Sequence, residues 1–581
     1  MPLPPRPLTA LLATLALSGC AHQAPLPPPP TAAAPEVATT AAAPDNTASA
    51  PVAPGRPFST DTLAALLEGE FAGYRQRPDI ALHLYTEQAR QTRDPGVVAR
   101  AATIAQLLGQ AESLEMSQLW TEVAPDSPEA WYLLVLNSLR MQQFERLMPA
   151  LEGLLALQPD ADLEQVFLAG APTSPNARSA LLATLDDIEP RFATNPHILF
   201  ARALLQSQAG ARDTALLTVR EARRLRPGSP QINLLEAKLL SESGQDREAA
   251  QLLASAVAAR PDSYSLRLNY ARSLVRSRDL AGAEREFRTL VERHPGDASL
   301  RLGLALIAFE NRHDEEAHRQ FETLINHEEH GDEASYYLGQ LHRRRGDTDA
   351  AILAYERVLP GPQFLPAQAE ISRLLARNNQ LREARQRLAE ARAQLPDLRP
   401  ALYQLEAELL GEQKQHAEAR ALLDEALAAQ PDNLQLLMSR AMSAEREGRL
   451  DLFEADVRDV LRRDPDNASA LNALGYTLLI RTTRRDEAET YIRRAHEIKP
   501  DDPAIIDSLG WAKFLRGDVA GALQQLQRAY ALFQDDEIAA HLGEVLWASG
   551  QRQEARRIWD DGLRRHPGSE HILDTRRRLE K

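Results

Sequence analysis

Apolar side chains recur every three or four residues along most of the chain, from about Thr60 to the C-terminus. This spacing places them on one face of an amphipathic α-helix, and strand-like alternation of apolar and polar residues is almost absent. Turn residues interrupt the pattern at short, regular intervals. The sequence therefore predicts an all-α fold in which one short helix follows another.

Prolines that are followed by a small or acidic residue mark the repeat. Neighbouring members of the series are 34 or 35 residues apart at six places, for example from Pro227 to Pro261 and from Pro465 to Pro500. Proline cannot continue a helix interior, so it ends each unit. The series comprises Pro125, Pro159, Pro227, Pro261, Pro295, Pro396, Pro431, Pro465, Pro500 and Pro567.

Small residues recur inside the units at the same period. In the unit that ends at Pro261 these positions are Ala237, Gly244, Ala249 and Ala256. Two antiparallel helices approach closely only where side chains are small. A period of 34 residues resembles that of the tetratricopeptide repeat. The resemblance implies a right-handed superhelical solenoid of about fourteen helical hairpins, because a single hairpin leaves an apolar face uncovered.

The period is weakest between Pro159 and Pro196, where residues 169–175 interrupt it. We interpret this stretch as a divergent unit or as a joint between two sub-arrays. The predicted organisation is a signal peptide (1–19), a tether (20–58), N-terminal repeat-like units with an irregular joint (59–196) and a regular solenoid with a C-terminal capping helix (197–581).

The first twenty residues carry a targeting signal. An apolar run from Leu8 to Leu17 is too short to span a bilayer and is typical of a signal peptide. The following Leu17-Ser18-Gly19-Cys20 resembles the bacterial lipobox, in which the cysteine is lipidated, although an ordinary signal peptide with a chance cysteine remains the alternative. By the lipoprotein sorting rule, Ala21 after the cysteine implies the outer membrane and a body that faces the periplasm.

The segment after the cysteine predicts a disordered tether. Residues 24–57 are rich in Pro, Ala and Thr, and they include four consecutive prolines at 27–30. Such a composition forms no core and favours extended polyproline conformations. We expect the folded body to be held at a distance from its membrane anchor.

Three consecutive units near the C-terminus match one template and suggest a binding surface. They contain Leu474-Gly475-Tyr476, Leu509-Gly510-Trp511 and Leu542-Gly543. The match places aromatic residues on the first helix of successive units, near positions that line the concave groove in this family. Aromatic anchors in a groove are typical of protein-binding sites. The predicted groove residues are Asn472, Tyr476, Trp511, Phe514 and Trp547, and the alternative is that the aromatic rings pack between units.

Charge and side-chain chemistry argue against a catalyst or a nucleic-acid binder. The 82 acidic and 67 basic residues give a formal charge of −15, which disfavours phosphate backbones. No nucleophile, base and oxyanion-donor set is apparent, so no catalytic residue and no cofactor is predicted. His313 and His318 are five residues apart rather than four, and they diverge on a helix, so no metal site is predicted there.

A closer resemblance covers the whole chain. Residues 66–74, Arg93-Asp94-Pro95-Gly96-Val97, Asn472-Ala473-Leu474-Gly475-Tyr476 and Asp507-Ser508-Leu509-Gly510-Trp511, with the lipobox and tether, resemble the LbcA family of outer-membrane lipoproteins. That family implies an adaptor that binds and activates a periplasmic carboxyl-terminal processing serine protease and delivers peptidoglycan hydrolases to it. The alternative is a repeat scaffold of an envelope export, outer-membrane assembly or polysaccharide secretion machine.

Overall fold

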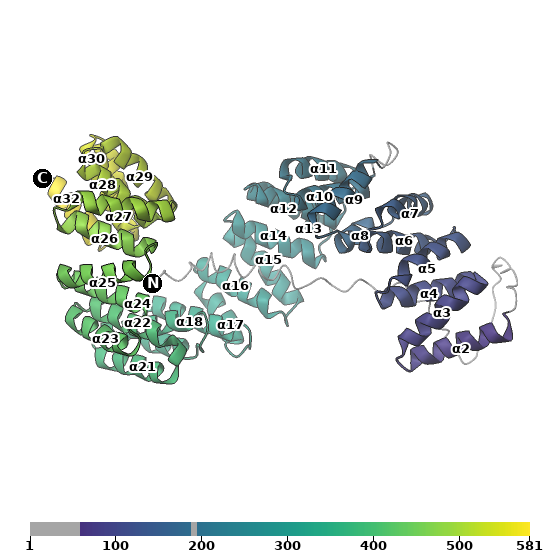
Figure 1. The fold of residues 1–581 in the computed structure, drawn as a ribbon, viewed down its shortest axis with the longest axis horizontal. Coiled ribbons are helices and arrows are strands. Elements are labelled where there is room, and N and C mark those ends of the chain that lie inside the picture. The colour runs from purple at the N-terminus through teal and green to yellow at the C-terminus, as the bar shows by residue number, and fades with distance from the viewer. Residues whose placement is uncertain (1–57, 188–194, 581) are drawn as a thin grey trace. The chain divides into compact units, whose positions relative to one another are not determined.

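The computed structural model describes residues 58–187 and 195–580, and these residues form two compact units. The first unit ends at His330 and the second begins at Gly331. Within the described ranges, the regular structure consists of 31 α-helices and one short 3₁₀-helix, with no strand (Figure 1). The predicted signal peptide, the lipidation site Cys20 and the tether up to residue 57 lie outside the described residues.

The helices of the first unit are α2 (Thr60–Tyr74), α3 (Pro78–Thr92), α4 (Pro95–Leu107), α5 (Glu112–Val123), α6 (Pro128–Arg140), α7 (Phe144–Leu157), α8 (Leu163–Gly170), α9 (Pro175–Asp187), α10 (Pro196–Gln208), α11 (Arg212–Leu225), α12 (Pro230–Glu242), α13 (Asp246–Ala259), α14 (Tyr264–Arg276), α15 (Leu280–Arg293), α16 (Ala298–Glu310) and α17 (Asp314–Leu324).

The helices of the second unit are α18 (Gly331–Arg345), α19 (Thr348–Glu356), α20 (Phe364–Arg377), α21 (Leu381–Gln394), η2 (Pro396–Leu398), α22 (Arg399–Glu412), α23 (His416–Ala429), α24 (Leu434–Arg446), α25 (Leu450–Arg463), α26 (Ala468–Arg481), α27 (Arg485–Ile498), α28 (Pro503–Leu515), α29 (Val519–Leu532), α30 (Asp536–Ala548), α31 (Arg552–Arg565) and α32 (Glu570–Leu579).

Consecutive helices pack in pairs as antiparallel hairpins. Three pairs run from α2/α3 to α6/α7, and eleven run from α10/α11 to α30/α31, so fourteen hairpins form in the described residues. Within each unit, most hairpins pack against the next one, and apolar clusters run from α5 to α12 and from α22 to α28; α8 and α9 lie between the hairpins α6/α7 and α10/α11. The predicted all-α class and the solenoid of hairpins are confirmed within each unit.

The residues that punctuate the sequence explain where the helices begin. Pro227 follows the C-cap of α11, and the next helix, α12, starts at Pro230 after an N-cap serine. Ser229 accepts a hydrogen bond from the backbone N–H of Ile232, which satisfies one of the free donors at the helix start. Proline suits the first helical position because it has no N–H to leave unpaired.

Glycine closes the turn inside many hairpins and allows close helix contacts elsewhere. Gly244, between α12 and α13, has φ +74°, a left-handed conformation that glycine adopts without strain. Gly475 on α26 serves packing instead. A Cβ at this position would lie 2.7 Å from Ile492 Cγ1 and 2.8 Å from the backbone oxygen of Ala488, both on α27. The two helices of this hairpin therefore cross where no side chain intervenes.

The predicted irregular stretch is irregular in the structure as well. Helix α8 has only eight residues, and it packs on α6 and α10 rather than forming a hairpin with α9. The buried carboxylate of Glu164 on α8 lies 3.1 Å from Nδ1 of His197 on α10 and 3.6 Å from the guanidinium of Arg226. A charged contact thus joins α8 to the regular hairpins that follow. The domain boundaries inferred from sequence stay predictions.

Candidate protein-binding surfaces

The predicted groove residues lie on the first helices of three successive hairpins, as the repeat alignment implies. Asn472 and Tyr476 are on α26, Trp511 and Phe514 are on α28, and Trp547 is on α30. All five side chains are half-buried rather than fully exposed. The neighbours of each side chain determine how much of its surface a partner protein can contact.

Tyr476 and Trp511 meet around a buried histidine of α30. The hydroxyl of Tyr476 donates a hydrogen bond to Glu537 at 2.6 Å, and it lies 3.3 Å from Nε2 of His541. The indole of Trp511 stacks on the His541 ring with centroids 4.2 Å apart. One phenol and one indole thereby join α26 and α28 to α30, two repeats further along the chain than Tyr476.

An ion pair fixes the same histidine from the other side. Nδ1 of His541 lies 2.9 Å from the carboxylate of Asp507 on α28, and both residues are buried. Burial opposes the charged imidazolium, but Asp507, together with Glu537 and Glu544, raises the pKa of His541 above its ordinary value. Burial and the Glu537 carboxylate likewise raise the pKa of Tyr476.

The other predicted residues are dispersed around this cluster. Phe514 packs beside Trp511 with centroids 5.2 Å apart. Trp547 packs instead on Trp559, and the guanidinium groups of Arg552 and Arg556 lie 5.1 and 5.2 Å from its ring centroid. Buried Oδ1 of Asn472 has no hydrogen-bond partner in the described part of the chain.

The contacts of Tyr476 and Trp511 join different repeats, as the packing alternative supposes, whereas Phe514 contacts its own helix and Trp547 its own hairpin. A role of the five residues in partner binding stays a prediction.

An apolar stripe on α2, the first helix in the described residues, is a second candidate surface, which the sequence did not single out. Leu63, Leu67, Phe71 and Tyr74 of α2 follow helical spacing, and the last three are 52, 63 and 89% exposed. Their spacing puts them on one face of the helix. The apolar spacing is visible in residues 66–74 of the sequence. The sequence alone does not say whether this face is exposed or packs against another repeat.

The last helix presents a contrasting surface. Helix α32 exposes mainly polar residues (Glu570, His571, Asp574 and Arg577) together with Leu573, and it buries Ile572 and Thr575. Arg578 donates to both carboxylate oxygens of Glu544, at 2.7 and 2.6 Å, which fastens α32 to α30. A polar outer face is what the terminal repeat of a solenoid needs for solubility. A capping role for α32 stays a prediction, whereas α2 leaves apolar side chains exposed.

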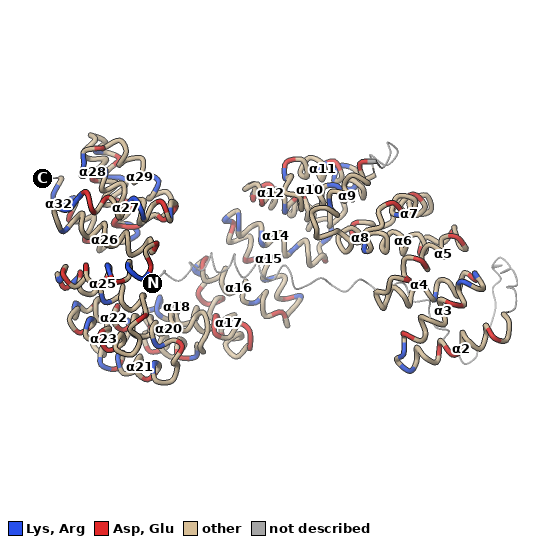
Figure 2. Tube along the Cα trace, viewed as in Figure 1, with Lys and Arg blue, Asp and Glu red and all other residues tan. Residues whose placement is uncertain are grey.

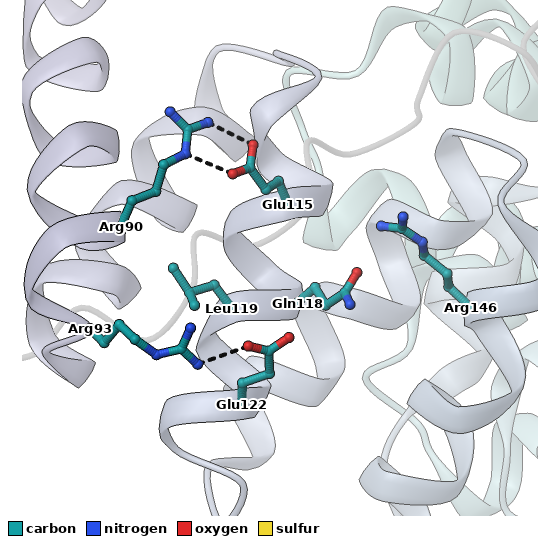
Figure 3. Close-up of a pocket in the computed structure, with 7 residues that line it drawn as sticks. All are labelled: Arg90, Arg93, Glu115, Gln118, Leu119, Glu122 and Arg146. Atoms are coloured by element: carbon teal, nitrogen blue, oxygen red, sulfur yellow. Dashed lines mark hydrogen bonds and ion pairs between the residues drawn. The ribbon is translucent and has the colours of Figure 1, made fainter.

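Charges of both signs alternate along the helices in each unit (Figure 2). Many form ion pairs between neighbouring repeats, and a pocket of about 420 Å³ lies among such pairs on α3, α5 and α7 (Figure 3).

Of the histidines considered for a metal, His313 places its Nδ1 2.7 Å from Glu284. Across 58–187 and 195–580, no helix has the length and apolarity to cross a membrane.

Comparison with known proteins identifies the repeat. Family models described as tetratricopeptide repeat match residues 240–307, 302–366, 405–459 and 454–503. The TPR repeat-containing protein PA4667 of Pseudomonas aeruginosa is 43% identical over 541 residues, which cover 92% of this chain and 90% of that protein.

Two solved structures are similar over most of this chain but at low identity. Cut9–Hcn1 of the APC/C is 13% identical, covers 90% of this chain and 97% of its own, and has a TM-score of 0.31. Yeast Tom70 is 15% identical, with coverages of 89 and 99% and a TM-score of 0.34.

Proposed function

This chain belongs to the tetratricopeptide-repeat proteins, and from that premise we propose that it is a periplasmic adaptor anchored to the outer membrane. In this role it binds and activates a carboxyl-terminal processing serine protease and delivers peptidoglycan hydrolases to it. Tetratricopeptide repeats are generally non-enzymatic scaffolds that bind protein partners. The protease, its substrates and the membrane location are the proposed part.

The exposed stripe of α2 is the observation that carries the proposal. Leu67, Phe71 and Tyr74 expose large apolar side chains on one face of α2, where polar residues would favour solubility. Large aromatic and aliphatic side chains that a partner can bury are typical anchors of protein interfaces. We infer that α2 contacts the protease, which leaves the hairpins that follow free to hold a substrate.

An adaptor of this kind acts by raising local concentration. Holding protease and substrate on one chain converts their encounter into an intramolecular event, with effective concentrations that reach the millimolar range for short linkages. Lipidation of Cys20 would restrict the complex to the membrane surface. The resemblance of residues 66–74 and of the C-terminal repeat motifs to the LbcA family supports this choice of partners.

Affinity purification from detergent-solubilised envelopes tests the proposal. The wild-type chain should retain a serine peptidase together with cell-wall hydrolases. The double variant Leu67→Asp/Phe71→Asp should lose the peptidase, because it puts charges into the apolar stripe. The control Leu217→Asp alters a leucine of α11 that is more exposed, at 69%, and this variant should retain the peptidase.

Other outcomes of the purification would contradict the proposal. Recovery of a porin-like or synthase subunit in place of a peptidase would favour the export-scaffold alternative. Equal loss of the peptidase in the α2 variant and in the control would show that α2 is not the contact.

A further inference from the structure

The pocket on α3, α5 and α7 lies on the second helices of three successive hairpins. Its lining comprises Arg90, Arg93, Glu115, Gln118, Leu119, Glu122 and Arg146. A volume of about 420 Å³ falls in the range of small-ligand sites and holds a few side chains of a partner. All seven residues belong to the first unit, so the lining of the pocket comes from that unit alone.

Second helices of neighbouring hairpins are joined by arginine–carboxylate pairs in both units. Arg90 on α3 donates to both oxygens of Glu115 on α5 at 2.7 Å, and Arg93 pairs with Glu122 at 2.9 Å. The same arrangement recurs further along the chain, in Arg220–Glu248 (2.8 Å), Arg385–Glu418 (2.9 Å) and Arg458–Glu487 (2.7 Å). In these four pairs of helices, the arginine belongs to the earlier second helix and the carboxylate to the next one.

Among the described residues, no ion pair of this kind joins α5 to α7. Arg146 of α7 points toward α5, but the residue that faces it is the neutral Gln118 (Figure 3). Within the described ranges, the Arg146 guanidinium has no hydrogen bond or ion pair, and the Gln118 amide has no hydrogen bond. Glu115 and Glu122 are already paired with Arg90 and Arg93. Three guanidinium groups against two carboxylates leave the pocket one positive charge in surplus.

We propose that this pocket binds a glutamate or aspartate side chain from an acidic segment of a partner protein. The Arg146 fork and the Gln118 amide are the donors for the carboxylate, a charge-assisted arrangement that favours arginine. Half-buried Leu119 offers an apolar contact beside them. The inference goes beyond the proposed function, since it holds for an acidic partner whether or not that partner is a protease or a hydrolase.

The charge balance favours a protein carboxylate over a polyanion. A nucleic acid or an anionic membrane requires an extended basic surface, and this chain carries −15 overall with one surplus charge at the pocket. A single carboxylate neutralises that surplus. The weak positive field also predicts that binding falls as salt rises, because the site is open to solvent.

Fluorescence anisotropy with the purified full-length chain tests the site. The probe is a labelled peptide of repeated Glu-Leu units with an acetylated N-terminus and an amidated C-terminus, and its partner probe has Gln in place of Glu. We expect at least about tenfold tighter binding of the Glu peptide at low salt, as befits hydrogen bonds to charged groups. A third peptide has a free C-terminal carboxylate and no acidic side chain, and it should bind no better than the Gln peptide.

Two variants locate the site. Arg146→Gln should weaken the Glu peptide about fivefold or more, whereas Arg224→Gln removes an exposed arginine of α11 and should leave affinity unchanged. Gln118→Glu supplies Arg146 with an internal carboxylate and should abolish binding without loss of helix content in circular dichroism.

Three results would overturn the inference. The first is equal binding of the Glu peptide and either control peptide. The second is equal weakening by Arg146→Gln and Arg224→Gln, which indicates general surface electrostatics. The third is undiminished binding by Gln118→Glu.

Discussion

Replacing His541 with glutamine tests whether the buried cluster of α26, α28 and α30 holds the C-terminal repeats together. The substitution removes the partner of Asp507, which is buried 2.9 Å from the imidazole, and it removes the ring that stacks on Trp511. Breaking a buried ion pair by removing one partner costs about 3–5 kcal/mol. A lost aromatic contact adds about 1 kcal/mol. Because glutamine keeps some hydrogen bonding, we expect a loss of about 3 kcal/mol.

Native-state hydrogen exchange of the full-length chain measures this loss locally. A loss of about 3 kcal/mol corresponds to roughly 150-fold faster exchange of amides that open with α28 and α30. Peptides from α10 to α16 should keep their wild-type rates, since repeats contact only their neighbours. The control His571→Gln alters an exposed residue of α32 and should change nothing. Unchanged exchange in α28 and α30 of His541→Gln would refute the reasoning.

The pH dependence of the stability difference between wild type and His541→Gln gives an independent check. A histidine whose folded-state pKa is raised contributes stability that is complete below its unfolded pKa of about 6.5. That contribution is lost as the pH rises through the folded-state pKa. The difference between wild type and His541→Gln should therefore be largest near pH 6 and shrink toward pH 9. A difference that stays constant over this range would mean that folding does not raise the pKa of His541.

Two further substitutions test the packing and the turns. Gly475→Ala should lower stability by about 1–2 kcal/mol, because clashes with the α27 backbone outweigh the gain in helix propensity. The control Gly73→Ala on α2, where nothing lies within 4 Å of the added Cβ, should be neutral or stabilising, and urea unfolding and local hydrogen exchange measure both variants. Lys414→Gly should raise stability by about 0.5–1 kcal/mol, since Lys414 has φ +60° in a turn where other hairpins use glycine, and a lower urea midpoint would contradict this.

The periodic part of the fold is accessible from sequence because the signals that produce it are local. The prolines at Pro227 and Pro261 end helices, and Gly244 and Gly517 take left-handed conformations in the turns. The loss of period at residues 169–175 predicted an irregular stretch. It could not predict that α8 would leave α9 and pack on α6 and α10, because that depends on contacts between distant helices.

The candidate site was only partly predictable, for the same reason. The repeat alignment placed Tyr476 and Trp511 correctly on the first helices of their hairpins. It gave no sign that Tyr476 reaches Glu537 and His541, which lie 61 and 65 residues away, since a period defines equivalent positions and not the curvature that brings them together. The position of Arg146 opposite the neutral Gln118 was equally hidden, because it becomes visible only once α5 and α7 are placed side by side.

The two candidate binding surfaces lie on α2 and on α3, α5 and α7, whereas the buried His541 cluster lies on α26, α28 and α30, so binding and local stability can be tested separately. In a solenoid each repeat draws its stability from itself and its neighbours, so damage at His541 does not spread to α2 or to the pocket of α3, α5 and α7. A variant in the C-terminal cluster that unfolds α28 and α30 should still bind an acidic peptide through Arg146. Conversely, charges placed in the α2 stripe should abolish partner binding while hydrogen exchange at α30 stays unchanged. If both measurements moved together in either variant, the repeats would be coupled along their whole length, and the assignment of separate roles to the two ends would have to be withdrawn.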